Sequence, residues 1–146
     1  MNIIFDYNRT LFNPDENKLY EGVRELLEKL YKDFSLFLLS YDEVGREKFM
    51  KDSEFIKFFK NVALVDQKSK TSMLQLVEAF PADATLVIGD SLRDEIKIGN
   101  ELGYETIWLK KGKFSSEIPR SDEEKPRYII SELEEVLEIL KKYKKE

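Results

Sequence analysis

The stretch Ile3-Ile4-Phe5-Asp6-Tyr7-Asn8-Arg9-Thr10-Leu11 decides the fold of this chain. Three apolar residues lead directly into an aspartate, and a short polar turn follows that ends at a threonine. Such an apolar run is typical of a strand that is covered on both faces of a parallel sheet. The strand would deliver the carboxylate of Asp6 to the carboxyl edge of the sheet, where open α/β sheets bind their ligands. The stretch therefore predicts a ligand site around Asp6.

Further apolar runs alternate with helical patterns along the rest of the chain. A helical pattern is recognised by apolar residues three and four positions apart, as at Val23, Leu26, Leu27 and Leu30. The expected strands are residues 2–5, 34–39, 62–65, 85–88, 106–109 and 128–130, and the expected helices are residues 19–31, 44–50, 53–59, 69–80, 92–102 and 131–143. This alternation predicts an α/β fold, a three-layer doubly wound (Rossmann-like) parallel sheet of five to six strands. No segment is left for a linker, so we expect residues 1–146 to form a single core domain without a cap domain.

The composition narrows the chemistry that the chain can perform. It contains no cysteine and no histidine, which excludes thiolate chemistry and removes the commonest general base. A metal site must then be built from oxygen ligands, which favours a hard cation such as Mg²⁺. The 24 Lys and Arg residues against 29 Asp and Glu residues give a net charge of −5, which argues against nucleic-acid backbone binding. The charged content of 36% is similar to that of thermophile proteins.

No targeting or membrane segment is recognisable in the sequence. The N-terminal residues enter a strand at once, without the basic segment and apolar run of a signal peptide. No apolar stretch approaches the length of a membrane span. We therefore expect a cytoplasmic protein that does not bind membranes.

Polar residues follow four of the expected strands. Asp6, Ser40 and Asp90 each come directly after an apolar run, and Lys68 and Lys70 follow the third strand. The stretch Gly89-Asp90-Ser91-Leu92-Arg93-Asp94 also places a second carboxylate one helical turn further on. With Asp6, these carboxylates would form an acidic cluster whose repulsion a magnesium ion would relieve. Taken alone, Ser91-x-x-Asp94 is better explained as a helix capping box than as a metal site, but the addition of Asp6 favours a site.

The ordered set of motifs resembles the haloacid dehalogenase-like hydrolase superfamily, most of whose members are magnesium-dependent phosphatases. That family has an apolar strand followed by Asp-x-Asp-x-Thr, then a Ser or Thr that ends the second strand, a Lys near a later helix, and Gly-Asp-x-x-x-Asp after the fourth strand. Here the corresponding residues are Asp6 to Thr10, Ser40, Lys68 or Lys70, and Gly89 to Asp94. Each motif is weak alone, but their order along nearly the whole chain is specific.

The resemblance implies a role for each of these residues. Asp6 would be the nucleophile that forms an aspartyl-phosphate, and Mg²⁺ would be held by Asp6, the backbone carbonyl of Asn8, and Asp90 with or without Asp94. Ser40 would bind a phosphoryl oxygen, Thr10 would hold the loop, and Tyr41 is a candidate for contacting the substrate. A lysine would neutralise the transferring group, and the spacing leaves Lys68 and Lys70 both open, with a preference for Lys70.

Asn8 departs from the family pattern, which has an aspartate at this position. That aspartate protonates the leaving oxygen and then activates water, whereas a carboxamide cannot exchange a proton near neutral pH. Loss of a positioned acid/base costs on the order of 10²–10⁴ in rate. The sequence therefore predicts a slow phosphohydrolase that prefers good leaving groups. The alternative is an impaired protein that binds a phosphorylated ligand or partner without turnover.

The expected partners follow from the short loops of the site. Residues 7–18 and 66–69 are too few to hold a cap domain, so the site would be open to solvent. An open site favours a bulky or macromolecular phosphorylated substrate, or a lid supplied by a partner or a second copy. A receiver-like signalling domain also places Asp, Ser or Thr and Lys at strand ends. It would lack the pair Asp90 and Asp94, and is the least favoured interpretation.

Overall fold

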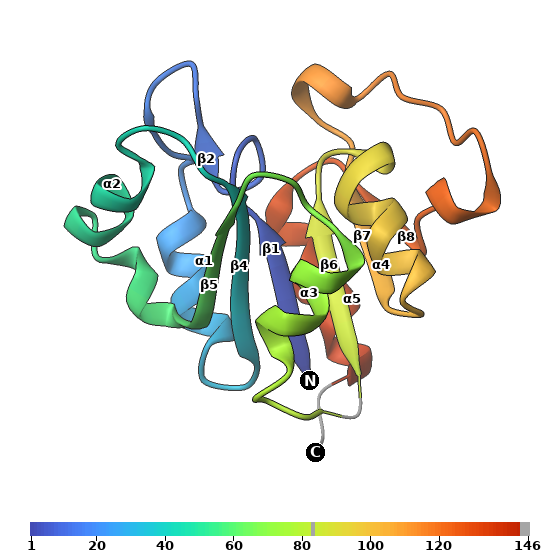
Figure 1. Ribbon diagram of the computed structural model, residues 1–146, viewed down its shortest axis with the longest axis horizontal. Helices are drawn as coiled ribbons and strands as arrows, with labels where there is room; N and C mark the ends of the chain where they lie inside the picture. The colour runs from blue at the N-terminus through green and yellow to red at the C-terminus, as the bar shows by residue number, and fades with distance from the viewer. Residues whose placement is uncertain (83, 144–146) are drawn as a thin grey trace.

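The computed structural model describes residues 1–82 and 84–143. A six-stranded sheet with the order β5-β4-β1-β6-β7-β8 forms its centre, and every neighbouring pair of strands is parallel (Figure 1). The strands are β1 (Asn2–Asp6), β4 (Ser35–Tyr41), β5 (Phe59–Val65), β6 (Thr85–Gly89), β7 (Glu105–Leu109) and β8 (Tyr128–Ile130). The chain builds outward from β1 to β5 and then returns to the other side of β1. The predicted doubly wound sheet is therefore confirmed.

Helices cover both faces of the sheet and complete three layers (Figure 1). Helices α1 (Val23–Leu30) and α5 (Val136–Leu140) share one core with Ile3 and Phe5, while α3 (Lys70–Val77) packs against Ile4 on the other face. Helix α4 (Lys97–Glu101) lies beside α3, on the same face. Successive side chains of β1 point to opposite faces, which explains why Ile3, Ile4 and Phe5 in its centre are all apolar.

The shorter elements differ from the expected ones. The loop after β1 contains a small antiparallel hairpin of β2 (Phe12–Asn13) and β3 (Lys18–Leu19). The helix expected over residues 44–50 is α2 (Arg46–Asp52), and residues 53–59 contain a 3₁₀ turn, η1 (Phe55–Phe58). The helix expected over residues 92–102 is divided into a π-helical segment, η2 (Leu92–Ile96), and α4. Two 3₁₀ turns, η5 (Leu133–Glu135) and η6 (Lys141–Tyr143), flank α5.

The register of the central strands brings the predicted polar residues to one edge. Asp6 at the end of β1 pairs with Leu39 of β4, so Ser40 follows one residue beyond. Phe5 pairs with Ile88 of β6, which places Gly89 beside Asp6 and Asp90 just after it. Among the described residues, no helix combines the length and the apolar character that a membrane-spanning segment needs.

Candidate active site

Asp6 lies at the carboxyl edge of the sheet and is 5% exposed. Its Oδ2 atom accepts a hydrogen bond from the hydroxyl of Thr10 at 3.1 Å, and its Oδ1 atom accepts one from the ammonium group of Lys68. Thr10 is also buried, and the backbone amides of residues 10–12 all donate to the carbonyl of Tyr7, which tightens the turn. The loop after β1 therefore fixes the carboxylate from one side while Lys68 approaches it from another.

Lys68 is the lysine that the structure places at this site. Its side chain is 2% exposed, and its ammonium group lies 3.2 Å from Glu95 as well as against Asp6. Burial opposes the charge of Lys68, but the two carboxylates outweigh it and raise the pKa above its ordinary value. Lys70, which the spacing slightly favoured, has a side chain that is 55% exposed and pairs with Glu101 at 3.2 Å. The preference for Lys70 is corrected accordingly: Lys70 begins α3 on the surface, whereas Lys68 in the preceding loop turns inward.

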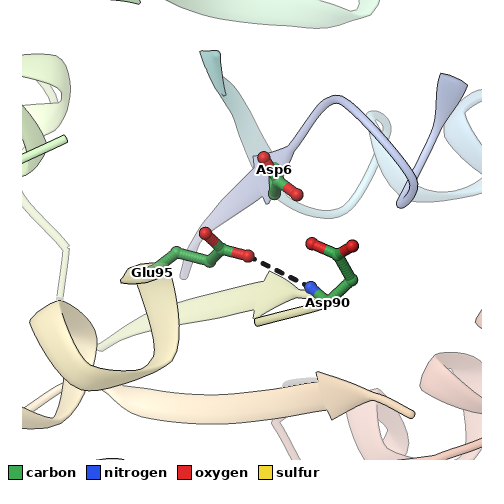
Figure 2. Close-up of side chains that lie close together, drawn as sticks. All are labelled: Asp6, Asp90 and Glu95. Atoms are coloured by element: carbon green, nitrogen blue, oxygen red, sulfur yellow. Dashed lines mark hydrogen bonds between the residues drawn. The ribbon is translucent and has the colours of Figure 1, made fainter. Parts of the chain in front are cut away.

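Three carboxylates gather at the edge of the sheet, as Figure 2 shows. One oxygen from each of Asp6, Asp90 and Glu95 lies within 4.8 Å of the others, and all three residues are buried. Burial, followed by the charges of Asp6 and Glu95, raises the pKa of Asp90 to about 9. Burial and Asp6 likewise raise the pKa of Glu95 to about 7, against the opposing effect of Lys68. Three carboxylates this close need a cation or a proton among them.

Glu95 takes the position that was expected for Asp94. Its Oε1 atom accepts hydrogen bonds from the backbone amides of Asp90, at 3.1 Å, and Ser91, at 3.3 Å, while Oε2 faces Lys68. The bond to the amide of Asp90 is drawn in Figure 2. A Cβ atom at Gly89 would lie 2.2 Å from the side chain of Glu95, so glycine is needed for this approach. Glu95 thus ties the start of the loop after β6 to Lys68.

Asp94 points to a different partner, which corrects the expectation that it joins Asp6 and Asp90. Its Oδ2 atom accepts a hydrogen bond from the hydroxyl of Tyr41 at 2.7 Å. Asp94 has non-helical backbone angles, φ −116° and ψ −110°, within the π-helical segment η2. This local geometry turns Glu95, one residue later, toward Asp6. The capping box of Ser91 and Asp94 does not form either, because the backbone amide of Ser91 donates to Glu95 at 3.3 Å and its hydroxyl donates to Glu117 at 3.3 Å.

Tyr41 forms part of the wall beside Lys68. Its ring centroid lies 5.0 Å from the ammonium nitrogen of Lys68, and the residue is 38% exposed. Burial and the hydrogen bond to Asp94 raise the pKa of the Tyr41 hydroxyl to about 12. Tyr41 therefore lies where the cluster meets solvent.

Ser40 is 1% exposed and has a neighbour that the sequence did not indicate. Its hydroxyl donates to the carbonyl of Tyr41 at 2.8 Å and accepts from Nη1 of Arg46 at 3.1 Å. Asn8, in the turn after Asp6, has a buried side-chain oxygen without a hydrogen-bond partner among the described residues. Ser40 in β4 and Asn8 in the turn after β1 both lie at the edge of the sheet that carries Asp6.

The donor set fits a hard divalent cation. The cluster offers carboxylate oxygens without a histidine or thiol, which suits Mg²⁺. The Oδ2 atom of Asp90 is buried and has no hydrogen-bond partner among the described residues, so it is free to bind an ion. Both oxygens of Glu95 are already engaged, whereas Asp6 and Asp90 face each other (Figure 2). Asp6 and Asp90 are thus the best-placed direct ligands, with Glu95 behind them.

Three residues of this site were not predicted as site residues. Arg46 donates to the hydroxyl oxygen of Ser40, and the indole of Trp108 donates to the carbonyl of Asp90 at 2.9 Å. Glu95 carried a signal, because a carboxylate five residues after Asp90 also falls on the following helix. Choosing it over Asp94 required the π-helical geometry, which no residue pattern indicated.

Comparison with known proteins gives the family context of this site. Residues 67–136 match the family model described as HAD-hydrolase-like. The HAD-hydrolase YfnB of Bacillus subtilis is 29% identical over 138 residues, covering 88% of this chain and 57% of YfnB. The pyrimidine 5′-nucleotidase PynA of Streptococcus pneumoniae is 25% identical over 140 residues, covering 87% of this chain and 56% of PynA. The chain thus spans little more than half the length of these two relatives.

A solved structure shows the same fold. The crystal structure of YfnB bound to magnesium superimposes with a TM-score of 0.77 at 19% identity, covering 95% of this chain and 97% of that chain. Together, these matches confirm the resemblance to the haloacid dehalogenase-like (HAD) hydrolases that the motifs predicted.

Proposed function

We propose that this HAD-like chain is a magnesium-dependent phosphohydrolase that acts through an aspartyl-phosphate on Asp6. The observation that carries the proposal is the buried carboxylate of Asp6, held by Thr10 and Lys68 beside Asp90 and Glu95. A carboxylate fixed in this way can attack phosphorus, and covalent catalysis divides a difficult displacement into two easier steps. The nucleotidase PynA and the magnesium-bound structure of YfnB support the reaction class and the cation.

Each residue around Asp6 would have a defined part in the reaction. Lys68 neutralises charge on the transferring group, Ser40 donates to a phosphoryl oxygen, and Thr10 holds the orientation of Asp6. Mg²⁺ would be held by Asp6, Asp90 and the backbone carbonyl of Asn8, and when bound it offsets the negative charge of phosphate and carboxylates. Glu95 would orient Lys68 and the loop after β6.

Asn8 determines the expected rate of turnover and the preferred type of leaving group. Its carboxamide can donate a hydrogen bond to the leaving oxygen but cannot transfer a proton to it. Aryl phosphates, whose leaving groups need no proton, would be turned over faster than alkyl phosphates. Residues 66–69, which connect β5 to α3, are too few to hold a cap domain. We therefore propose a bulky or macromolecular phosphorylated substrate, with a lid supplied by that substrate, by a partner or by a second copy.

The direct test compares two variants for hydrolysis of p-nitrophenyl phosphate with and without Mg²⁺. Asp6→Asn removes the nucleophile and should abolish turnover, while Asp15→Asn changes an exposed aspartate of the following loop and should not. Equal rates for the wild type and Asp6→Asn would contradict the proposal. Loss of activity in both variants would point to a loss of folding, which circular dichroism would show.

A second candidate function is binding of a phosphorylated ligand or protein without turnover. It is favoured by Asn8, which stands where the family has its acid/base. Beryllium fluoride with Mg²⁺, which imitates an aspartyl-phosphate, should raise the melting temperature under either function. Steady-state turnover distinguishes them, because the second function predicts the same absence of product release in the wild type and Asp6→Asn.

A further inference from the structure

A buried arginine contacts the predicted phosphate-binding serine from behind. Arg46 is the first residue of α2, and its side chain is 6% exposed. Its Nη1 atom donates to the hydroxyl oxygen of Ser40 at 3.1 Å and to the carbonyl of Tyr41 at 2.7 Å. The sequence did not predict this contact, because Arg46 lies outside the four strand-end motifs.

The charge of Arg46 is only partly compensated by its ion-pair partner. Nη2 lies 3.0 Å from Glu43, whose side chain is 63% exposed, so that solvent screens this pair. The guanidinium also lies over the ring of Tyr7, 5.1 Å from its centroid, and Tyr7 is 1% exposed. The stacked ring and the two hydrogen bonds restrict Arg46 to one orientation, with its positive charge directed at the end of β4.

The number of hydrogen-bond donors around Ser40 explains what Arg46 can contribute. Ser40 has a single hydroxyl hydrogen, and it is donated to the Tyr41 carbonyl at 2.8 Å. Binding a phosphoryl oxygen requires that hydrogen. Its removal would leave the Tyr41 carbonyl without a donor, which would cost free energy if no other group donated to it. Arg46 already donates to the same carbonyl, so the hydrogen of Ser40 can move without that loss. Donation into the Ser40 oxygen also polarises its O–H bond and strengthens it as a donor.

We propose that Arg46 is a positioning residue that frees the Ser40 hydroxyl for a phosphoryl oxygen on Asp6. This role rests on the proposed function, because it requires a phosphoryl group at Asp6. Arg46 itself does not touch the substrate. Its contribution is expected only when Ser40 is present, which separates this role from a purely structural one.

The test is a double-mutant cycle on Ser40 and Arg46, read by calorimetric titration of beryllium fluoride in the presence of Mg²⁺. Ser40→Ala and Arg46→Gln should each weaken binding by about tenfold, the size of one hydrogen bond to a charged group. The double variant should bind no more weakly than Ser40→Ala alone, because Arg46 acts through Ser40. Arg24→Gln is the matched control, since Arg24 is a half-buried arginine that donates to the carbonyl of Ser53, and it should bind as the wild type does.

Melting curves and circular dichroism check that each variant is folded. If Arg46→Gln does not fold, Arg46→Lys replaces it, because an ammonium group lacks the planar fork of the guanidinium and should also weaken binding. A folded Arg46 variant with wild-type affinity would overturn the inference, and so would additive losses in the double variant. A wild-type protein that does not bind beryllium fluoride would overturn the proposed function together with this role, so the two failures are distinguishable.

Discussion

The ammonium nitrogen of Lys68 lies 2.5 Å from Oδ1 of Asp6, and their side chains are 2% and 5% exposed. Loss of one partner of such a buried pair leaves the other charge without compensation, which is strongly unfavourable. Glu95 on the other side of Lys68 extends the pair to a triad of alternating charge. The site is therefore sensitive to Lys68 in both folding and chemistry.

Replacement of Lys68 by methionine should lower aryl-phosphate turnover by about 10²–10³, because a fixed cation no longer stabilises the transferring group. Methionine keeps much of the side-chain volume and avoids a cavity. Lys70→Met serves as the matched control, since the side chain of Lys70 is 55% exposed, and it should leave turnover unchanged. Initial rates with p-nitrophenyl phosphate measure both variants. A greater loss in Lys70→Met would mean that the site forms around the other lysine.

Replacement by asparagine should weaken Mg²⁺ binding at Asp90 much more than at Asp94. Asp90→Asn removes a buried oxygen that has no partner among the described residues and should weaken Mg²⁺ binding by more than tenfold. Asp94→Asn keeps an acceptor for the Tyr41 hydroxyl and should change Mg²⁺ affinity by less than about twofold. Isothermal titration with MgCl₂ gives both constants. Equal losses in the two variants would show that Asp94 also binds the ion.

Magnesium binding should release protons and should strengthen as the pH rises from about 7 to 9. In the metal-free site the pKa of Asp90 is raised to about 9 and that of Glu95 to about 7, so Asp90 retains its proton at neutral pH. The ion requires the carboxylate form, so each displaced proton makes the affinity up to tenfold stronger per pH unit. Titrations in buffers of different ionisation enthalpy count the released protons. A heat independent of the buffer would contradict this prediction.

The same raised pKa of Asp90 sets the pH dependence of the metal-free stability. A carboxyl group that holds its proton more tightly when folded favours folding at low pH, and that contribution is lost as the pH rises from about 4 towards 9. Added Mg²⁺ should offset the loss, because it binds the ionised folded state. Melting curves at pH 6 and pH 9, with EDTA or with MgCl₂, measure this difference. The Asp90→Asn variant is the control and should show a smaller dependence on both pH and Mg²⁺.

The substitution Asn8→Asp should raise turnover of alkyl phosphates by about 10²–10⁴ and that of aryl phosphates much less. It restores a group that can protonate a poor leaving group, which an activated aryl leaving group does not need. Aspartate has nearly the same shape as asparagine, so the change introduces an acid without a steric clash. Rates with an alkyl phosphate and with p-nitrophenyl phosphate give the ratio. An unchanged ratio would place Asn8 away from the leaving oxygen.

The sequence predicted those features that depend on strand order and apolar patterning. Buried parallel strands are almost purely apolar, so β1, β4 and β6 were recognisable, and with them the edge that carries Asp6, Ser40 and Asp90. The hairpin of β2 and β3 was missed because strands of two residues show no alternation. Local patterns therefore fix which elements form the edge of the sheet.

The sequence did not predict which individual side chains at that edge point into the site. Lys68 and Lys70 are two residues apart, and only the path of the loop after β5 decides that Lys68 turns inward. Asp94 and Glu95 are adjacent, and the backbone geometry of η2 decides between them. Arg46 lies six residues after Ser40, with no pattern linking the two. Such choices depend on tertiary packing, which overrides local preference.

The order of the strands in the sheet determines when the site forms during folding. Asp6 belongs to the middle of the sheet, while Lys68 and Asp90 come from segments 62 and more residues away along the chain. Contacts between such distant segments form late, because the entropy of loop closure must be overcome before they stabilise anything. A chain that has paired only β1, β4 and β5 would present Asp6 without Asp90, and hence only part of a cation site. Tight binding of a phosphate mimic with Mg²⁺ would thus report that β6 has docked beside β1.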